Sequence, residues 1–86
     1  MLEALEQAEH RVVGIKQCEK AVLRNTAETV YIAQDADDRV IWKLQQLCEE
    51  REVRVDNQHN MQEIGRACGI QVKAGSAAIL KPDKDS

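Results

Sequence analysis

Four apolar residues in a row, Val30-Tyr31-Ile32-Ala33, stand near the middle of the 86-residue chain. An unbroken apolar run of this length is typical of a strand covered on both faces, as in layered α/β proteins. Asp35, Asp37 and Asp38 follow the run, and aspartate favours turns and helix N-termini. This part of the chain therefore predicts a central strand that leads directly into a helix.

Strand-like and helix-like patterns alternate along the rest of the sequence. Further short strands are expected at residues 11–14, 53–55 and 77–80, which are mostly apolar and bounded by turn residues. Helices are expected between the strands because apolar side chains recur there at helical spacing. The apolar positions of these four helices are Leu2, Leu5 and Ala8; Cys18, Ala21 and Val22; Val40, Ile41, Leu44, Leu47 and Cys48; and Met61, Ile64, Ala67 and Cys68.

The fourth expected helix has recognisable signals at both ends. Asn60 followed by Glu63 fits a capping box, and Gly69 stands where a glycine commonly ends a helix. Helices that alternate with short strands predict a three-layer α/β/α sandwich with a small mixed sheet. We expect residues 1–80 to form this single domain and residues 81–86 to be a polar C-terminal tail.

Composition narrows the class of protein. A chain with 43% apolar but only 2% aromatic residues is expected to fold around an aliphatic core. The net charge of −3, from 12 basic and 15 acidic residues, argues against a protein that wraps nucleic acid by charge alone, although a local basic patch is compatible with it. Cys18, Cys48 and Cys68 have neither metal nor disulfide-scaffold spacing, so we expect buried thiols in a reducing compartment. No apolar segment has the length of a membrane span or signal peptide, which predicts a cytoplasmic protein without membrane contact.

The segment Gly14-Ile15-Lys16-Gln17-Cys18-Glu19-Lys20 is the best candidate for a binding function. A glycine turn here leads from a strand into a helix, and a helix N-terminus favours phosphate because its backbone N–H groups are unpaired. Lys16 and Lys20 can donate to guanine O6 and N7, whereas Gln17 can both donate and accept at a base edge. A basic helix face is also common as a merely solvated surface, so spacing alone leaves both interpretations open.

Four motifs in the same order resemble the ribosomal protein L7Ae family of kink-turn RNA binders, in particular its compact bacterial YbxF-like members. The resemblance covers about residues 2 to 80. The motifs are Gly14-x-Lys16-Gln17-x-x-Lys20, Ala33-x-Asp35-Ala36-Asp37, Leu47-Cys48-Glu49-Glu50 and Gly65-Arg66-Ala67-Cys68-Gly69.

This resemblance implies an α/β/α sandwich that binds RNA helices sharply bent at a bulge flanked by sheared G·A pairs. It implies that Gly14 is a close-approach turn and that Lys16, Gln17 and Lys20 read guanines and phosphates. Asp37 falls on an acidic position that helps to place the bulged region. The remaining implied RNA-binding residues lie in the segment that matches a nucleotide-holding loop, and they are Ile70, Val72 and Lys73.

Several of these residues also have purely structural explanations. Asp37 can be a helix cap, and Ile70 and Val72 can be core residues at the entrance to a strand. Trp42 lies away from the apolar face of its helix, so we expect it either to be an exposed anchor for a protein partner or to fold over the edge of the core.

The functional expectation is a non-enzymatic RNA-binding protein that recognises a kink-turn or similar bent motif, associated with the ribosome and its RNA. No nucleophile and base stand together in the sequence, and His10 and His59 lack partners at metal-binding spacing, so neither catalysis nor a metal or other cofactor is expected. The alternative is a protein-interaction or regulatory domain on the same fold, with Trp42 as its contact residue.

Overall fold

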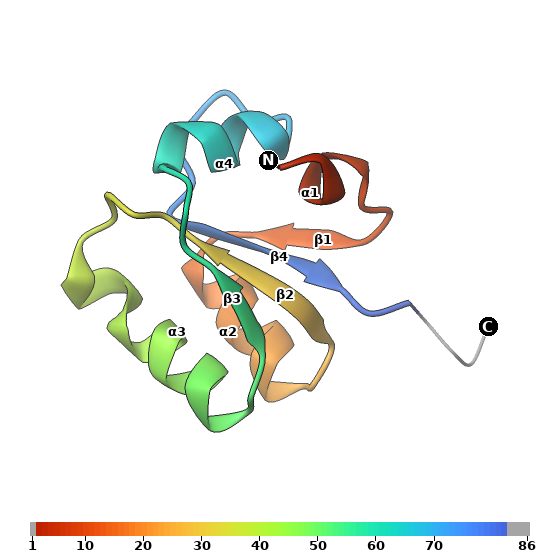
Figure 1. The fold of residues 1–86 in the computed structure, drawn as a ribbon, viewed down its shortest axis with the longest axis vertical. Coiled ribbons are helices and arrows are strands. Elements are labelled where there is room, and N and C mark those ends of the chain that lie inside the picture. Colours follow the sequence, from red (N-terminus) through yellow and green to blue (C-terminus); the bar gives the residue numbers. More distant parts are fainter. Residues whose placement is uncertain (1, 83–86) are drawn as a thin grey trace.

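The computed structural model describes residues 2–82, in which helices and strands alternate (Figure 1). Residues 83–86, most of the predicted polar tail, lie outside the described part. In chain order the elements are α1 (Glu3–Gln7), β1 (Arg11–Val13), α2 (Ile15–Leu23), β2 (Ala27–Ile32), α3 (Asp38–Glu50), β3 (Arg54–Asp56), α4 (Met61–Ala67) and β4 (Ser76–Leu80).

The strands form one small mixed sheet in the order β1-β4-β2-β3. β4 pairs antiparallel with both β1 and β2, whereas β2 and β3 are parallel. It follows that β1, β2 and β3 run in the same direction and β4 runs against them. The carboxyl ends of three strands and the start of the fourth therefore meet at one edge of the sheet.

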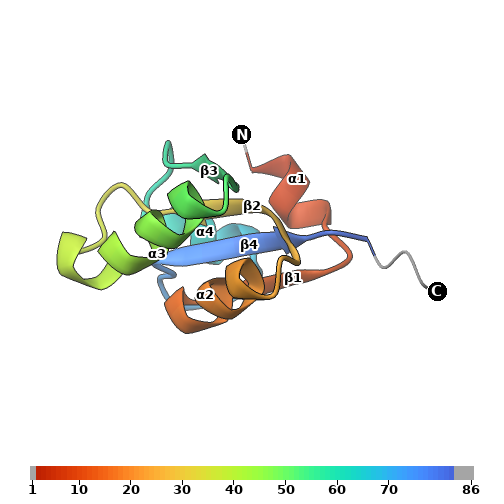
Figure 2. The same ribbon diagram turned by 90° about the horizontal axis from the view of Figure 1, so that it is seen from below.

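Helices cover both faces of the sheet, which confirms the predicted three-layer α/β/α sandwich. α2 and α3 lie on one face, and α1 and α4 lie on the other (Figures 1 and 2). The central strand β2 serves both layers: Val30 and Ile32 pack with α2 and α3, whereas Tyr31 packs with α1 and α4. The apolar run at residues 30–33 is thus covered on both faces, as its pattern predicts.

The structure shifts several element boundaries and corrects one core residue. β2 starts earlier than the apolar run, at Ala27, and ends one residue before it does, while β3 begins one residue later than expected. Val40 was expected in the core, but its side chain is 54% exposed. The reason is helical geometry: α3 buries Ile41, Leu44 and Cys48, and Val40 points about 100° away from Ile41 around the helix axis.

All three cysteines are free and buried, as the sequence predicts. Burial disfavours the thiolate and raises the pKa of Cys18 to about 12 and that of Cys48 to about 11; it also raises the pKa of Cys68, where the charge of Arg11 opposes the shift. We therefore expect the native protein to resist alkylation by iodoacetamide at pH 8, because the thiolate is the reacting form. Mass spectrometry of native and urea-unfolded protein checks this, and rapid labelling of the native protein would contradict it.

Among residues 2–82 no helix combines the length and the apolar character that crossing a membrane requires.

Candidate nucleic-acid interface

Backbone hydrogen bonds join four segments at the edge of the sheet where β1, β2 and β3 end. The N–H of Gly14 donates to Ser76 O over 2.9 Å, and the N–H of Ala33 donates to Gly75 O over 2.9 Å. The N–H of Gln34 donates to His59 O, also over 2.9 Å. We call this region the binding edge; it comprises residues 14–17, 33–37, 57–60 and 70–76. Residues that are up to 62 positions apart in the sequence, as Gly14 and Ser76 are, are thus held in one continuous rim.

Gly14 makes the turn from β1 into α2 at the binding edge. Its backbone angles, φ 103° and ψ 154°, lie in a region that only glycine adopts without strain. A side chain placed there would meet no neighbouring atom within 4 Å, so the space in front of Gly14 is open. No side chain caps the start of α2. The first N–H groups of this nine-residue helix therefore remain available to an external acceptor.

The polar residues that follow Gly14 all point outward. Lys16, Gln17 and Lys20 are exposed, whereas Cys18 is fully buried and accepts a 3.4 Å hydrogen bond from the buried hydroxyl of Ser76. This buried contact fixes α2 against β4. Lys20 lies one turn further from the edge and lines a shallow groove together with Gln17 and Arg24. The predicted contact residues of α2 thus form one exposed basic side of a firmly packed helix.

Asp37 is the N-cap of α3, which confirms the structural explanation of this residue. Its Oδ1 accepts the N–H of Arg39 over 2.9 Å, and the Arg39 guanidinium lies 3.4 Å from Oδ2. These two contacts hold the pKa of Asp37 below its usual value, the backbone bond contributing most. Asp37 is therefore ionised at neutral pH, and it lies on the binding edge where a second, external donor can reach it.

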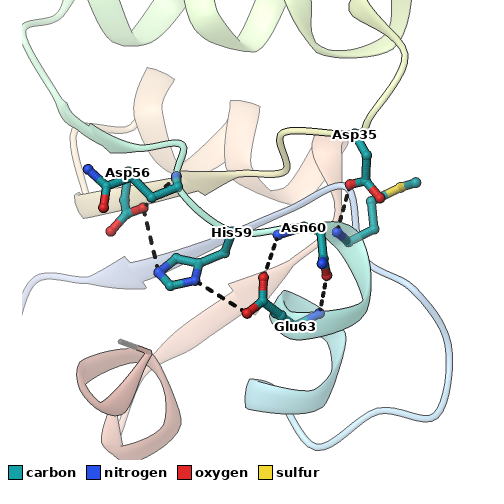
Figure 3. A network of polar contacts seen from close by, with 7 residues as sticks. Asp35, Asp56, His59, Asn60 and Glu63 are labelled. Carbon is teal, nitrogen blue, oxygen red and sulfur yellow. Dashed lines mark hydrogen bonds and ion pairs between the residues drawn. The ribbon is translucent and has the colours of Figure 1, made fainter.

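A network of polar contacts fixes residues 57–60 and the start of α4 (Figure 3). The predicted capping box is present: Asn60 Oδ1 accepts the N–H of Glu63 over 2.8 Å, and Glu63 Oε1 accepts the N–H of Asn60 over 3.0 Å. The His59 ring lies between Asp56 and Glu63, at 4.0 and 3.9 Å. Within residues 2–82 no group of His, Cys, Asp and Glu side chains forms a metal site.

Asp35 lies in the expected turn and also has a role that the sequence did not predict. The sequence placed it at the turn before α3, but its Oδ1 accepts the N–H of Met61, at the start of α4, over 2.8 Å (Figure 3). This bond crosses the binding edge and joins two loops that follow different strands. Local spacing gives no signal for it, because the two residues are 26 positions apart.

The loop before β4 contains the last three predicted contact residues. Ile70 is half-buried and packs against the core formed with α1 and α4, whereas Val72 is 70% exposed. The core explanation therefore holds for Ile70 but is wrong for Val72. Lys73 is exposed. A surface hollow of about 410 Å³ lies between the loop and α4. Its lining residues are Gln62, Arg66, Ile70, Gln71, Val72 and Lys73.

The Arg11 side chain connects the ends of α1 and α4 by hydrogen bonds. Its guanidinium donates to Leu5 O, Glu6 O and Cys68 O over 3.1–3.2 Å. These carbonyls belong to the ends of α1 and α4, where helix carbonyl groups lack partners within the helix. No local pattern predicts this role, because an arginine on a short strand is usually expected to face solvent.

We expect Arg11→Met to destabilise the fold by about 2 kcal/mol. Methionine keeps most of the aliphatic volume but removes every donor, and hydrogen bonds from a charged group contribute roughly 1.5–3 kcal/mol each where they are protected from water. Urea unfolding followed by circular dichroism measures the change. Arg24→Met, at the exposed C-cap of α2, is the control, and equal stability of the two variants would contradict the assigned role of Arg11.

Comparison with known proteins shows which family this chain is related to. The model of the ribosomal protein L7Ae/L30e/S12e/Gadd45 family matches residues 1–86. The chain belongs to this family. An RNA-binding protein of Caldanaerobacter subterraneus subsp. tengcongensis is 47% identical to this L7Ae-family chain over 68 residues, which are 79% of this chain and 83% of that protein. The RNA-binding protein YbxF of Geobacillus stearothermophilus is 38% identical over 79 residues, 92% and 96% of the two chains.

Solved structures agree with the sequence relatives. The Giardia lamblia 15.5kD RNA binding protein superimposes on this L7Ae-family chain with a TM-score of 0.81 and 33% sequence identity, covering 95% of this chain and 74% of that one. The family resemblance seen in the four sequence motifs is therefore confirmed.

Proposed function

We propose that this L7Ae-family chain is a non-enzymatic RNA-binding protein that recognises a kink-turn or a similarly bent RNA motif. The observation that carries the proposal is the binding edge, where an open glycine turn at Gly14, the exposed Lys16 and Gln17, and the loop at residues 70–73 share one rim of the sheet. The exposed Lys20 lies one turn further along α2. The relatives named as RNA-binding proteins support the same function.

Each part of the edge matches a part of such an RNA. Gly14 allows the RNA backbone to approach the start of α2, and the lysines donate to guanine O6 and N7 or to phosphates. Gln17 pairs with a base edge through its amide, and Asp37 offers an ionised acceptor for a base amino group. Ile70, Val72 and Lys73 hold a nucleotide turned out of the stack. Because the protein prefers the bent conformer, its binding shifts a flexible junction toward that form.

A titration with two RNAs tests the proposal. One RNA contains a kink-turn, and the other has its G·A pairs replaced by Watson–Crick pairs, which leaves length and charge unchanged. We expect tight binding to the first RNA and only weak, salt-sensitive binding to the second. Equal affinity for both, or no binding to either, would remove kink-turn recognition as the function.

The salt dependence of binding provides an independent prediction. A compact basic patch on a protein of net charge −3 neutralises few phosphates. With ~3 contacts, the slope of log K against log salt concentration is expected to be about −2 to −3. Fluorescence anisotropy at four salt concentrations gives this slope. A value several times steeper would indicate diffuse attraction along the duplex instead of a small footprint.

We propose that the natural target is a kink-turn in ribosomal RNA. The protein would then be associated with the ribosome. Crosslinking in living cells followed by sequencing of the bound RNA tests this part separately. Recovery of ribosomal RNA segments that fold as kink-turns is the expected result, and recovery of a messenger leader alone would assign the protein to a regulatory RNA.

One observation favours a second function, binding of a protein partner. Trp42 is 56% exposed on α3, and exposed tryptophan is common at the centre of protein interfaces. A pull-down from extract with and without RNase separates the two functions. A partner that survives RNase and is lost in Trp42→Ala would support protein binding, whereas loss on RNase treatment supports RNA binding.

A further inference from the structure

The hollow beside the loop at residues 70–73 has two walls, and only one of them is accounted for by the proposed RNA contacts. The loop supplies Ile70, Val72 and Lys73. The other wall is α4, which supplies Gln62 and Arg66 one helical turn apart. Neither residue has a structural role in residues 2–82: both side chains are exposed, and neither makes a hydrogen bond or ion pair there.

The distance between the two walls is set by Gly65, which lies between Gln62 and Arg66 in the sequence of α4. Gly65 is buried, and a side chain at this position would run into the carbonyl oxygen of Val72. The N–H of Ile70 also donates to Gly65 O over 3.1 Å, and the N–H of Ala74 donates to Met61 O over 3.1 Å. The loop is therefore held against the helix backbone on both sides of the hollow, so the hollow is a fixed feature of the fold.

The charges on this hollow differ from those of the protein as a whole. Although acidic residues outnumber basic ones in the chain, the six lining residues include two cations, two amides and no carboxylate. Arg66 also borders a second hollow that contains Glu6 and Glu63, but it pairs with neither within 4 Å. Arg11 provides a contrast on the same side of the sheet, since its guanidinium already donates to three carbonyl groups. Since no residue within 2–82 pairs with it, the Arg66 guanidinium can bind an anion.

We propose that Arg66 and Lys73 bind a backbone phosphate of the nucleotide that the loop holds, while Ile70 and Val72 contact its base. This inference rests on the proposed RNA-binding function and adds α4 as a second contact element. A guanidinium suits this task because its planar donors pair with two phosphate oxygens at once. Gln62 stands beside it as an additional donor. The base meets the apolar side of the hollow and the phosphate meets its cationic side.

The test compares Arg66→Gln with wild type on two kink-turn RNAs. In the first RNA every phosphate is native, and in the second the phosphates flanking the extruded nucleotide are uncharged methylphosphonates. On the native RNA we expect Arg66→Gln to weaken binding by about 5- to 20-fold and to reduce the salt slope by about 0.7, the value for one single-stranded phosphate. On the methylphosphonate RNA we expect the variant and wild type to bind equally.

Arg51→Gln is the matched control, because it makes the same change of net charge at the opposite end of α3 from the binding edge. If Arg66→Gln binds the native RNA like Arg51→Gln, or loses as much affinity on the methylphosphonate RNA, the phosphate role of Arg66 is overturned. Lys73→Gln repeats the test on the other wall if Arg66→Gln does not fold. The RNA with Watson–Crick pairs in place of its G·A pairs distinguishes failure of the Arg66 proposal from failure of the proposed function. If the wild-type protein binds this RNA as tightly as the kink-turn RNA, kink-turn recognition itself is refuted.

Discussion

Replacing Gly65 with alanine is expected to destabilise the fold by about 2 kcal/mol, although helix propensity alone predicts the opposite sign. Glycine inside a helix costs roughly 1 kcal/mol relative to alanine, so the substitution would stabilise an exposed helix. Here the new methyl group would run into the backbone carbonyl of Val72, and overfilling a packed site typically costs about 1–3 kcal/mol or more. Backbone cannot rotate away as a side chain can, so the loop itself must move.

The same substitution is expected to weaken RNA binding, because the displaced loop carries Val72 and Lys73. Urea unfolding and RNA titration of one protein preparation measure both effects. Gly69→Ala is the control: Gly69 has a φ of 73°, which strains alanine, but open space lies around it. We expect Gly69→Ala to cost about 1 kcal/mol of stability and to leave RNA affinity unchanged. A Gly65→Ala protein as stable as wild type would show that the loop is not held against α4.

Replacing Lys20 with alanine is expected to weaken kink-turn binding by roughly 1–3 kcal/mol with little change in stability. Lys20 is exposed on α2, one turn beyond Lys16, and its ammonium group makes no ion pair in residues 2–82. The loss on substitution is therefore a loss of contact with RNA. Isothermal titration calorimetry gives the affinity, and thermal unfolding confirms that the variant is folded.

Lys43→Ala on α3 controls for the change in charge, because it also removes one exposed lysine. Binding by Lys43→Ala should remain close to wild type. If Lys20→Ala binds as tightly as Lys43→Ala, then Lys20 belongs to the solvated surface and the reading of guanine edges by α2 is wrong.

The features that could be predicted from short stretches of sequence are those that depend on the spacing of apolar residues and on helix-capping residues. The apolar run at residues 30–33 gave the doubly covered strand, and Asn60 with Glu63 gave the capping box. Gly14 and Gly69 both have positive φ, as turn and helix-ending glycines do. The family resemblance, which combines four separate segments, predicted the α/β/α sandwich as a whole.

The features that the sequence did not predict depend on contacts between distant residues. Asp35 bonds to a backbone group 26 positions away, and Arg11 bonds to Cys68 O, 57 positions away. The close approach of the Val72 carbonyl to Gly65 depends on the path of a loop, which no local pattern specifies. The prediction that Val40 is buried was wrong for a simpler reason. An apolar residue next to the buried stripe of a helix need not face the core.

Mapping of amide chemical shifts on labelled protein during addition of a kink-turn RNA tests the location of the binding site most directly. The expected result is a set of shifted amides at residues 14–20, 35–37 and 70–75, with the outer strand β3 and the surroundings of Trp42 unchanged. Shifts centred on β3 or Trp42, with Gly14 and the start of α2 unaffected, would contradict the assignment of RNA binding to this edge of the sheet.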